Sequence, residues 1–140
     1  MTDSTMRSVR PDVDIAHDVQ QILVHYPPLA LDRRHVAIDV RQGVVVLRGH
    51  VKTPITRRYL VDHAVRTPDV VRVDADRLYT EEDLRLAAGG LVPDGVMVNV
   101  RYGTVILNGT LADAAARDAL VAHISQIPGV EAVVTAFATP

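Results

Sequence analysis

Residues 36–49 read VAIDVRQGVVVLRG, and residues 96–109 read VMVNVRYGTVILNG. When residues 36–76 are aligned with residues 96–136 without a gap, 14 of the 41 aligned pairs are identical. A repeat of this length indicates that one structural unit has been duplicated. Two copies are too few for a solenoid, so the 140-residue chain is predicted to fold as two small tandem domains.

Each copy starts with two runs in which apolar residues alternate with polar or small ones. This alternation is typical of half-buried β-strands, and a short loop with a glycine separates the runs, so a β-hairpin is predicted. Gly43 and Gly103 lie in the two loops and are expected to have positive φ, while Gly49 and Gly109 end the second strands. Turn geometry explains all four glycines; the alternative is that they let a ligand approach the backbone.

A helix and a third strand are predicted to follow each hairpin. Thr53, which precedes Pro54, and Asp113 in the second copy are the predicted N-caps of these helices. The apolar face of each helix is expected to contact the core, and it carries Ile55, Tyr59, Leu60 and Ala64 in the first copy and Leu120, Val121, Ile124 and Ile127 in the second. Turns that contain proline then lead to short strands predicted at residues 70–73 and 130–134.

A helix is also predicted before each hairpin, and the two helices differ in length. The first covers residues 12–26 and is expected to end at Pro27 and Pro28. Its apolar face carries Ile15, Val19, Ile22, Leu23 and Tyr26. The second begins with T-E-E-D at residues 80–83, which resembles a capping box, and spans about two turns. The predicted fold class is α+β: two tandem α-β-β-α-β units, each a small three-stranded sheet with helices packed on one face.

The pattern [VI]-x-V-x-x-G-x-V-x-L-x-G, then a helix and P-[DG]-V-x-x-V, resembles the BON domain (bacterial osmotic-stress and nodulation domain). The residues that carry the resemblance are Ile38, Val40, Gly43, Val45, Leu47, Gly49, Pro68, Val70 and Val73, and in the second copy Val98, Val100, Gly103, Val105, Leu107, Gly109, Pro128, Val130 and Val133. The expected organisation is a disordered N-terminal tail at residues 1–11, a first BON-like domain at 12–79 and a second at 80–138 with a shortened first helix.

The resemblance implies a module without enzymatic activity. The family is associated with phospholipid membranes, envelope integrity and osmotic stress, and a cytoplasmic branch of it with potassium binding. The first residues lack the apolar core of a secretory signal, and no apolar run is long enough to span a membrane. We therefore expect a cytoplasmic protein, either free or peripheral at a membrane.

The residue composition also argues against catalysis and against a metal or other cofactor. The chain has no cysteine, which excludes disulfides and thiolate ligands, and none of its three serines lies in a G-x-S-x-G turn. No P-loop or G-x-G-x-x-G sequence occurs. The six histidines lack metal-ligand spacing, and the equivalent pair His63 and His123 is interpreted as inherited through the duplication.

Basic residues are concentrated in the middle of the chain. Residues 33–77 contain ten Lys and Arg against five Asp, a net charge of +5, whereas residues 1–32 carry −3 and residues 78–140 carry −4. A basic patch attracts anionic lipid headgroups, and each basic side chain contributes about 1 kcal/mol near the surface. The alternative is a solvated face that only maintains solubility. The candidate residues for contact with lipid or another partner are Arg33, Arg34, Arg41, Arg48, Lys52, Arg57 and Arg58.

The leading prediction is a binding or scaffolding module that associates with anionic phospholipid surfaces or protein partners, in stress or envelope physiology. One alternative is a cytosolic module that binds or senses potassium through backbone carbonyls. Another is a protein that assembles into homo-oligomers, because the basic first domain complements the acidic second domain of another copy. Nucleic acid is not expected as a partner, because four Tyr, one Phe and no Trp leave few stacking residues.

Overall fold

Both copies of the repeat form a three-stranded sheet with the same strand order and pairing. In the computed structural model, which describes residues 10–111 and 113–138, the two sheets have the orders β1-β2-β3 and β4-β5-β6. The first two strands of each sheet are an antiparallel hairpin, and the third runs parallel to the second. A parallel pair needs a crossover connection, which a helix supplies in both domains. The predicted α+β fold of two tandem units is thus confirmed.

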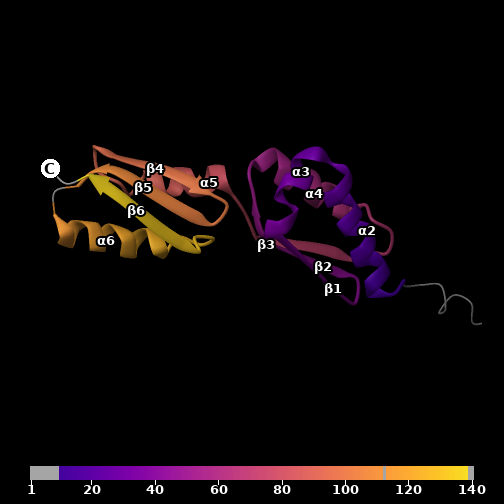
Figure 1. Ribbon diagram of the computed structural model, residues 1–140. Coiled ribbons are helices and arrows are strands. Elements are labelled where there is room, and N and C mark those ends of the chain that lie inside the picture. Colours follow the sequence, from indigo (N-terminus) through magenta and orange to yellow (C-terminus); the bar gives the residue numbers. More distant parts are fainter. Residues whose placement is uncertain (1–9, 112, 139–140) are drawn as a thin grey trace, which may run out of the picture.

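The first domain has three helices on one face of its sheet (Figure 1). Its elements are α2 (Asp12–His25), α3 (Pro27–Asp32), the 3₁₀ turn η1 (Arg33–His35), β1 (Val36–Arg41), β2 (Val44–Val51), α4 (Pro54–Val65) and β3 (Arg72–Thr80). The predicted apolar face of α2 is oriented inward, with Ile15, Val19 and Leu23 fully buried. These side chains pack with Leu60 of α4 and Leu47 of β2 in one core.

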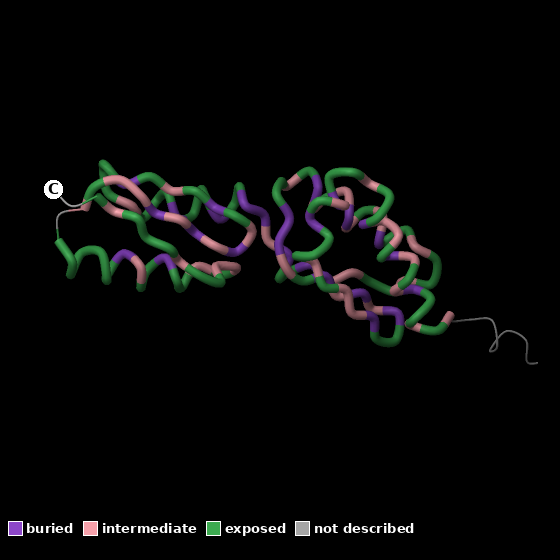
Figure 2. The backbone as a smooth tube through the Cα atoms, in the orientation of Figure 1, coloured by how far each residue is buried: buried purple, intermediate pink, exposed green. Residues whose placement is uncertain are grey.

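The second domain repeats the sheet but has less helix over it. Its elements are α5 (Glu81–Gly89), β4 (Val96–Arg101), β5 (Thr104–Thr110), α6 (Ala114–Ser125) and β6 (Ala132–Ala138). Its first helix, α5, has nine residues, whereas α2 in the first domain has fourteen, so helix covers fewer apolar side chains in the second domain. Much of α6 is exposed (Figure 2). Leu120 and Ile124 of α6 are buried with Leu84 and Ala88 of α5.

The helix α3 and the two third strands differ from the sequence prediction. Pro27 and Pro28 end α2, as expected, but they also begin α3. Proline is tolerated in the first turn of a helix because a backbone N–H at that position has no acceptor within the helix. The third strands begin at Arg72 and Ala132 and run to Thr80 and Ala138, later and longer than predicted. The predicted starts are still part of the turns, where the amide of Val71, for example, donates to the carbonyl of Gly43 at 2.8 Å.

The predicted helix caps are present, but one predicted core residue is exposed. Thr53 accepts a hydrogen bond from the amide of Thr56 at 3.1 Å, and Asp113 accepts one from the amide of Ala115 at 2.9 Å. Ile55, in the first turn of α4, is 72% exposed, whereas Thr56 is buried. The prediction for Ile55 was wrong because the first turn of α4 places Thr56, rather than its neighbour, toward the core. Most residues of the predicted 1–11 tail lie outside the described part of the chain.

Candidate functional site

The two domains follow each other without a linker. Thr80 is the last residue of β3 and also the N-cap of α5, where its hydroxyl accepts a hydrogen bond from the amide of Asp83 at 3.0 Å. Thr80 is fully buried. Tyr79, one residue earlier in β3, packs against the core of the second domain. The junction is therefore made by packed residues rather than by a loop.

Tyr102, in the β4–β5 turn, makes the first set of contacts across the junction. Its hydroxyl donates to Oδ1 of the buried Asp32 at 3.0 Å, and its ring stacks on His35 with the ring centroids 3.5 Å apart. Its amide donates to the Glu81 carboxylate. Burial first, and then the hydrogen bond to Asp32 and the charges of Asp32 and Glu81, raise the pKa of Tyr102 to about 12.

His50, near the end of β2, makes the second set of contacts. Its Nε2 donates to the carbonyl of Gly129 at 2.6 Å, and its Nδ1 lies 3.4 Å from Oε1 of Glu131. Only 6% of His50 is exposed. A Cβ placed on Gly103 would lie 2.8 Å from the His50 ring, closer than real Cβ contacts.

The second hairpin turn corrects one prediction about the glycines. Gln42 and Gly43 have φ of 52° and 79°, as a tight two-residue turn requires. In the second turn it is Tyr102 that has positive φ, at 55°, and the prediction for Gly103 was wrong. Gly103 is instead needed because His50 packs directly on its backbone. Gly49 and Gly109 have φ of 120° and 110°. The prediction that they end the second strands was wrong, because β2 continues to Val51 and β5 to Thr110.

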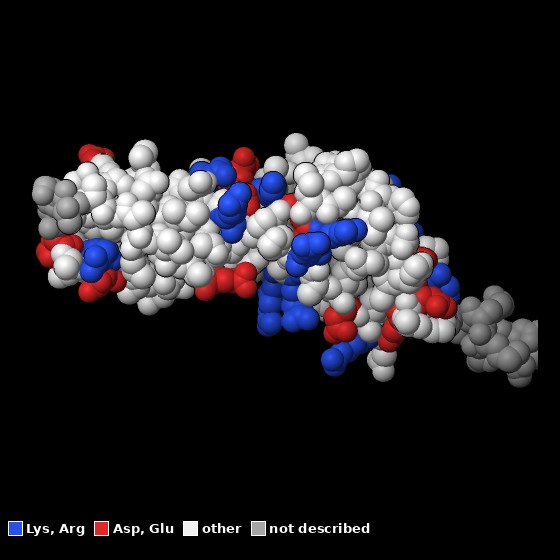
Figure 3. Space-filling view, in the orientation of Figure 1, with Lys and Arg blue, Asp and Glu red and all other residues white. Residues whose placement is uncertain are grey.

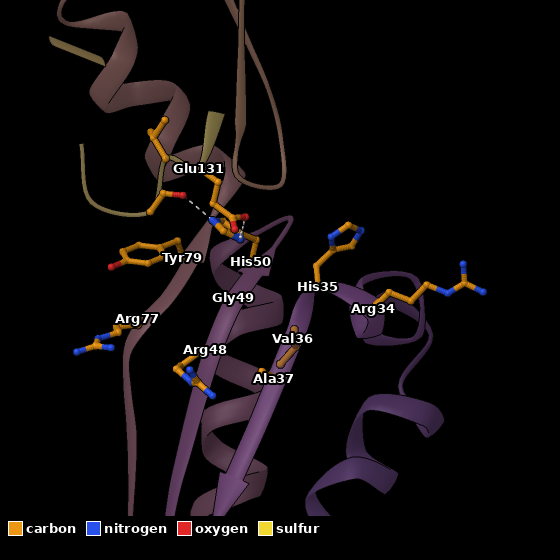
Figure 4. A pocket seen from close by; sticks show the side chains of 12 residues that line it. Arg34, His35, Val36, Ala37, Arg48, Gly49, His50, Arg77, Tyr79 and Glu131 are labelled. Atoms are coloured by element: carbon orange, nitrogen blue, oxygen red, sulfur yellow. Dashed lines mark hydrogen bonds and ion pairs between the residues drawn. The ribbon is translucent and has the colours of Figure 1, made fainter. Parts of the chain in front are cut away.

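A cavity of about 580 Å³ lies between the two domains and is called the junction cleft below (Figure 4). It is lined by Arg34, His35, Val36, Ala37, Arg48, Gly49, His50, Arg77, Tyr79, Gly129, Val130 and Glu131. Arg48 and Arg77 lie on the same side of His50, and Arg34 extends outward on the other side (Figure 4). Within the described part of the chain, no carboxylate forms an ion pair with these three arginines.

A bulge in β3 places Arg77 beside Arg48. Val46 pairs with Asp74, but two residues later Arg48 pairs with Arg77, so β3 holds one extra residue. With unbroken register Arg48 would face Asp76, which could pair with its charge. In the second domain the register is unbroken, and Asn108, the counterpart of Arg48, pairs with Ala136.

Arg57 holds this bulge from the helix side. Its Nε donates to the carbonyl of Leu78 at 2.8 Å, and its Nη2 donates to the carbonyl of Ala75 at 2.7 Å. These two carbonyls flank the bulged residues, where a strand ladder is locally disrupted. Arg117, the counterpart in α6, instead lies 3.6 Å from the Asp118 carboxylate.

The seven basic residues chosen from the sequence have different surroundings in the structure. Arg34 and Arg48 line the junction cleft, and Lys52 lines a neighbouring hollow of about 690 Å³ with Tyr102 and Glu81. Arg41, at the hairpin end of the sheet, lies 3.2 Å from the Asp39 carboxylate. The other three are placed separately: Arg33 and Arg58 are exposed on η1 and α4, and Arg57 is bonded to β3.

Sequence reasoning missed Arg77, His50 and Tyr102. The available indication was the difference between the two copies. His50 and Tyr102 replace Thr110 and Gln42 at equivalent positions, although the surrounding strand residues match. Arg77 lies just beyond the stretch that aligns without a gap, because the bulge ends the common register there.

The BON domain family model matches residues 11–79 and 83–139. The chain belongs to the BON domain family. Two structures of CdsD, a structural protein of the type III secretion system of Chlamydia trachomatis, resemble this tandem BON chain at 19% identity. One, of the C-terminal domain, has a TM-score of 0.79 and covers 94% of this chain and 68% of that one. The other has a TM-score of 0.77, with 94% and 65% covered. At this identity the likeness shows a common fold.

No curated protein sequence matches the chain significantly. Membership of the BON family supports the interpretation of the chain as a binding or scaffolding module. In residues 10–111 and 113–138, no group of three His, Asp or Glu side chains is placed to hold a metal ion. Among the described helices, none is long and apolar enough to cross a membrane.

Proposed function

We propose that this BON protein is a binding module that associates with anionic phospholipid surfaces through the junction cleft. The observation that carries the proposal is the set of three arginines at the cleft, Arg34, Arg48 and Arg77, which have no ion-pair partner among the described residues. Figure 3 shows Lys and Arg side chains gathered around the junction between the domains. Unpaired arginines in a concave site raise the local concentration of anions.

Vesicle co-sedimentation tests this proposal. The protein is mixed with vesicles of phosphatidylglycerol or of phosphatidylcholine, over a range of sodium chloride concentrations. We expect binding to the anionic vesicles alone. This binding should fall steeply as the salt concentration rises and shortens the Debye length below about 8 Å. Replacing Arg34 and Arg48 by glutamate should weaken binding more than replacing the exposed Arg72 and Arg66 does. Equal binding to both lipids, or insensitivity to salt, would contradict the proposal.

A second function, self-assembly, is favoured by the edge strand β6. This strand reads AVVTAFA, has no charged residue, and exposes 48% of Val134. The corresponding edge of the first domain, β3, carries Arg72, Asp74, Asp76 and Arg77 and a bulge, which are features that prevent edge pairing. We propose that β6 pairs with β6 of a second copy of this chain. The acidic second domain would make this pairing stronger at high salt.

A further inference from the structure

The β3 bulge produces an arrangement that is unfavourable in the unliganded protein. Arg48 and Arg77 are direct neighbours in the β2–β3 ladder, and strands lie about 4.8 Å apart. Two like charges in this position repel each other and destabilise a sheet. The fold does not require the bulge, because the second domain forms the same sheet without it. A bulge near a cleft commonly serves to re-aim a side chain.

We propose that Arg48 and Arg77 form a specific site for a phosphate-class anion at the wall of the junction cleft. The site rests on the proposed function, since it is where one anionic group of the bound surface would be held. The oxygens of a phosphate group accept paired hydrogen bonds from the N–H groups of a guanidinium. The negative charge of the anion also offsets the repulsion between the two arginines.

The surroundings of the pair limit what it binds. On the other side of Arg48 in the sheet lies Ala37, whose small side chain leaves the guanidinium accessible from the cleft. Asp74 and Asp76 line the adjoining hollow of about 370 Å³ with the two arginines, but neither carboxylate is within ion-pair distance of them. These carboxylates disfavour a second anion beside the first. The site therefore suits one compact phosphate group rather than a polyanion.

Arg57 has a positioning role in this site. Its two hydrogen bonds to the carbonyls of Ala75 and Leu78 hold the backbone on both sides of Asp76 and Arg77. The guanidinium of Arg57 does not line the cleft. Lysine cannot replace it, because a single ammonium lacks the fork of donors that reaches both carbonyls.

The test exchanges the two residues of the bulge. The double variant Asp76→Arg with Arg77→Asp keeps the composition and net charge but places a carboxylate beside Arg48. The native and exchanged proteins are titrated with inorganic phosphate at constant ionic strength, and the backbone amide and arginine Nε–H signals are followed by NMR. We expect saturable shifts at residues 48 and 77 in the native protein and binding weaker by roughly tenfold or more in the exchanged one. Arg72→Gln, on the same strand outside the cleft, should bind like the native protein.

A second arm uses a short-chain phosphatidylglycerol below its micelle concentration. Saturation by both ligands, or by either alone, supports the site if the exchange weakens that binding by roughly tenfold or more. The comparison of the two ligands identifies free phosphate or the lipid headgroup as the better ligand. Linear shifts with both ligands, or equal affinity in the exchanged protein, would overturn it. Arg48→Gln gives the same test if the exchanged protein does not fold. If vesicles bind without a saturable site, the proposed function stands and the site does not.

Discussion

Arg48 of β2 and Arg77 of β3 are direct partners across a parallel ladder, although neither forms an ion pair in the described part of the chain. The pairing exists because β3 has one more residue between Asp74 and Arg77 than β2 has between Val46 and Arg48. The equivalent strands of the second domain keep a regular register. Duplication thus supplied two copies of one fold, and a single added residue gives the first copy a surface that the second lacks.

The structural role of Arg57 predicts a loss of stability when its guanidinium is removed. Arg57→Met leaves the carbonyls of Ala75 and Leu78 without these donors, and the free energy of unfolding should fall by about 1–3 kcal/mol. The neighbouring Arg58 is exposed on the same helix, so Arg58→Met should change stability by less than about 0.5 kcal/mol. Urea denaturation measures both. Equal stability of the two variants would show that Arg57 does not hold the bulge.

Close packing at the junction predicts that Gly103 does not tolerate a methyl group. A Cβ there would lie 2.5 Å from Oε1 of Glu131 and 2.8 Å from the ring of His50. The Glu131 side chain can move, but the His50 ring is held by Gly129, so Gly103→Ala should cost about 1–3 kcal/mol in unfolding free energy. Gly89→Ala, with nothing near its Cβ, is the matched control and should be neutral or stabilising. A neutral Gly103→Ala would mean that the domains do not pack in this way.

The raised pKa of Tyr102 predicts a pH-dependent loss of stability that depends on this hydroxyl. Burial and Asp32 raise the pKa to about 12, whereas the unfolded chain has the ordinary value of 10.0. Between these values the unfolded state loses the proton first, so this contribution is fully present below pH 10 and falls as the pH rises towards 12. The thermal unfolding temperatures of the native protein and of Tyr102→Phe should therefore converge as the pH rises over this interval. A constant difference would contradict the raised pKa of Tyr102 in the folded protein.

The exposed edge of β6 predicts a mass that depends on concentration. Light scattering after size exclusion should show growth above 15.3 kDa as protein concentration rises, and more strongly at high salt. Val134→Lys places a charge on the edge strand and should keep the protein monomeric. Val71→Lys, at another exposed apolar position, is the control. A monomer at all concentrations would exclude pairing of β6.

Most of the fold follows from local patterns in the sequence. The alternation in both hairpins, the caps Thr53 and Asp113, and the inward face of α2 depend on residues close together in the chain. The starts of the third strands were predicted less well, because their length is set by pairing with β2 and β5.

The candidate site was less predictable, because it depends on register and on contact between domains. Arg34 and Arg48 were selected from their charge and their expected positions beside strand ends, but nothing local shows that Arg57 bonds to β3 or that a bulge turns Arg77 toward Arg48. Tyr102 and His50 differ from their counterparts in the other copy, and such differences on a repeated framework are the best sequence evidence for the junction.

The most direct test of the account is co-sedimentation of the native protein and the Asp76→Arg, Arg77→Asp variant with phosphatidylglycerol vesicles at one salt concentration. The two proteins have the same composition and net charge, so general electrostatic attraction is equal. If the arginine pair at the junction cleft holds the surface, the exchanged protein should bind at least about fivefold more weakly, the equivalent of about 1 kcal/mol. Equal binding by the two proteins would contradict the account.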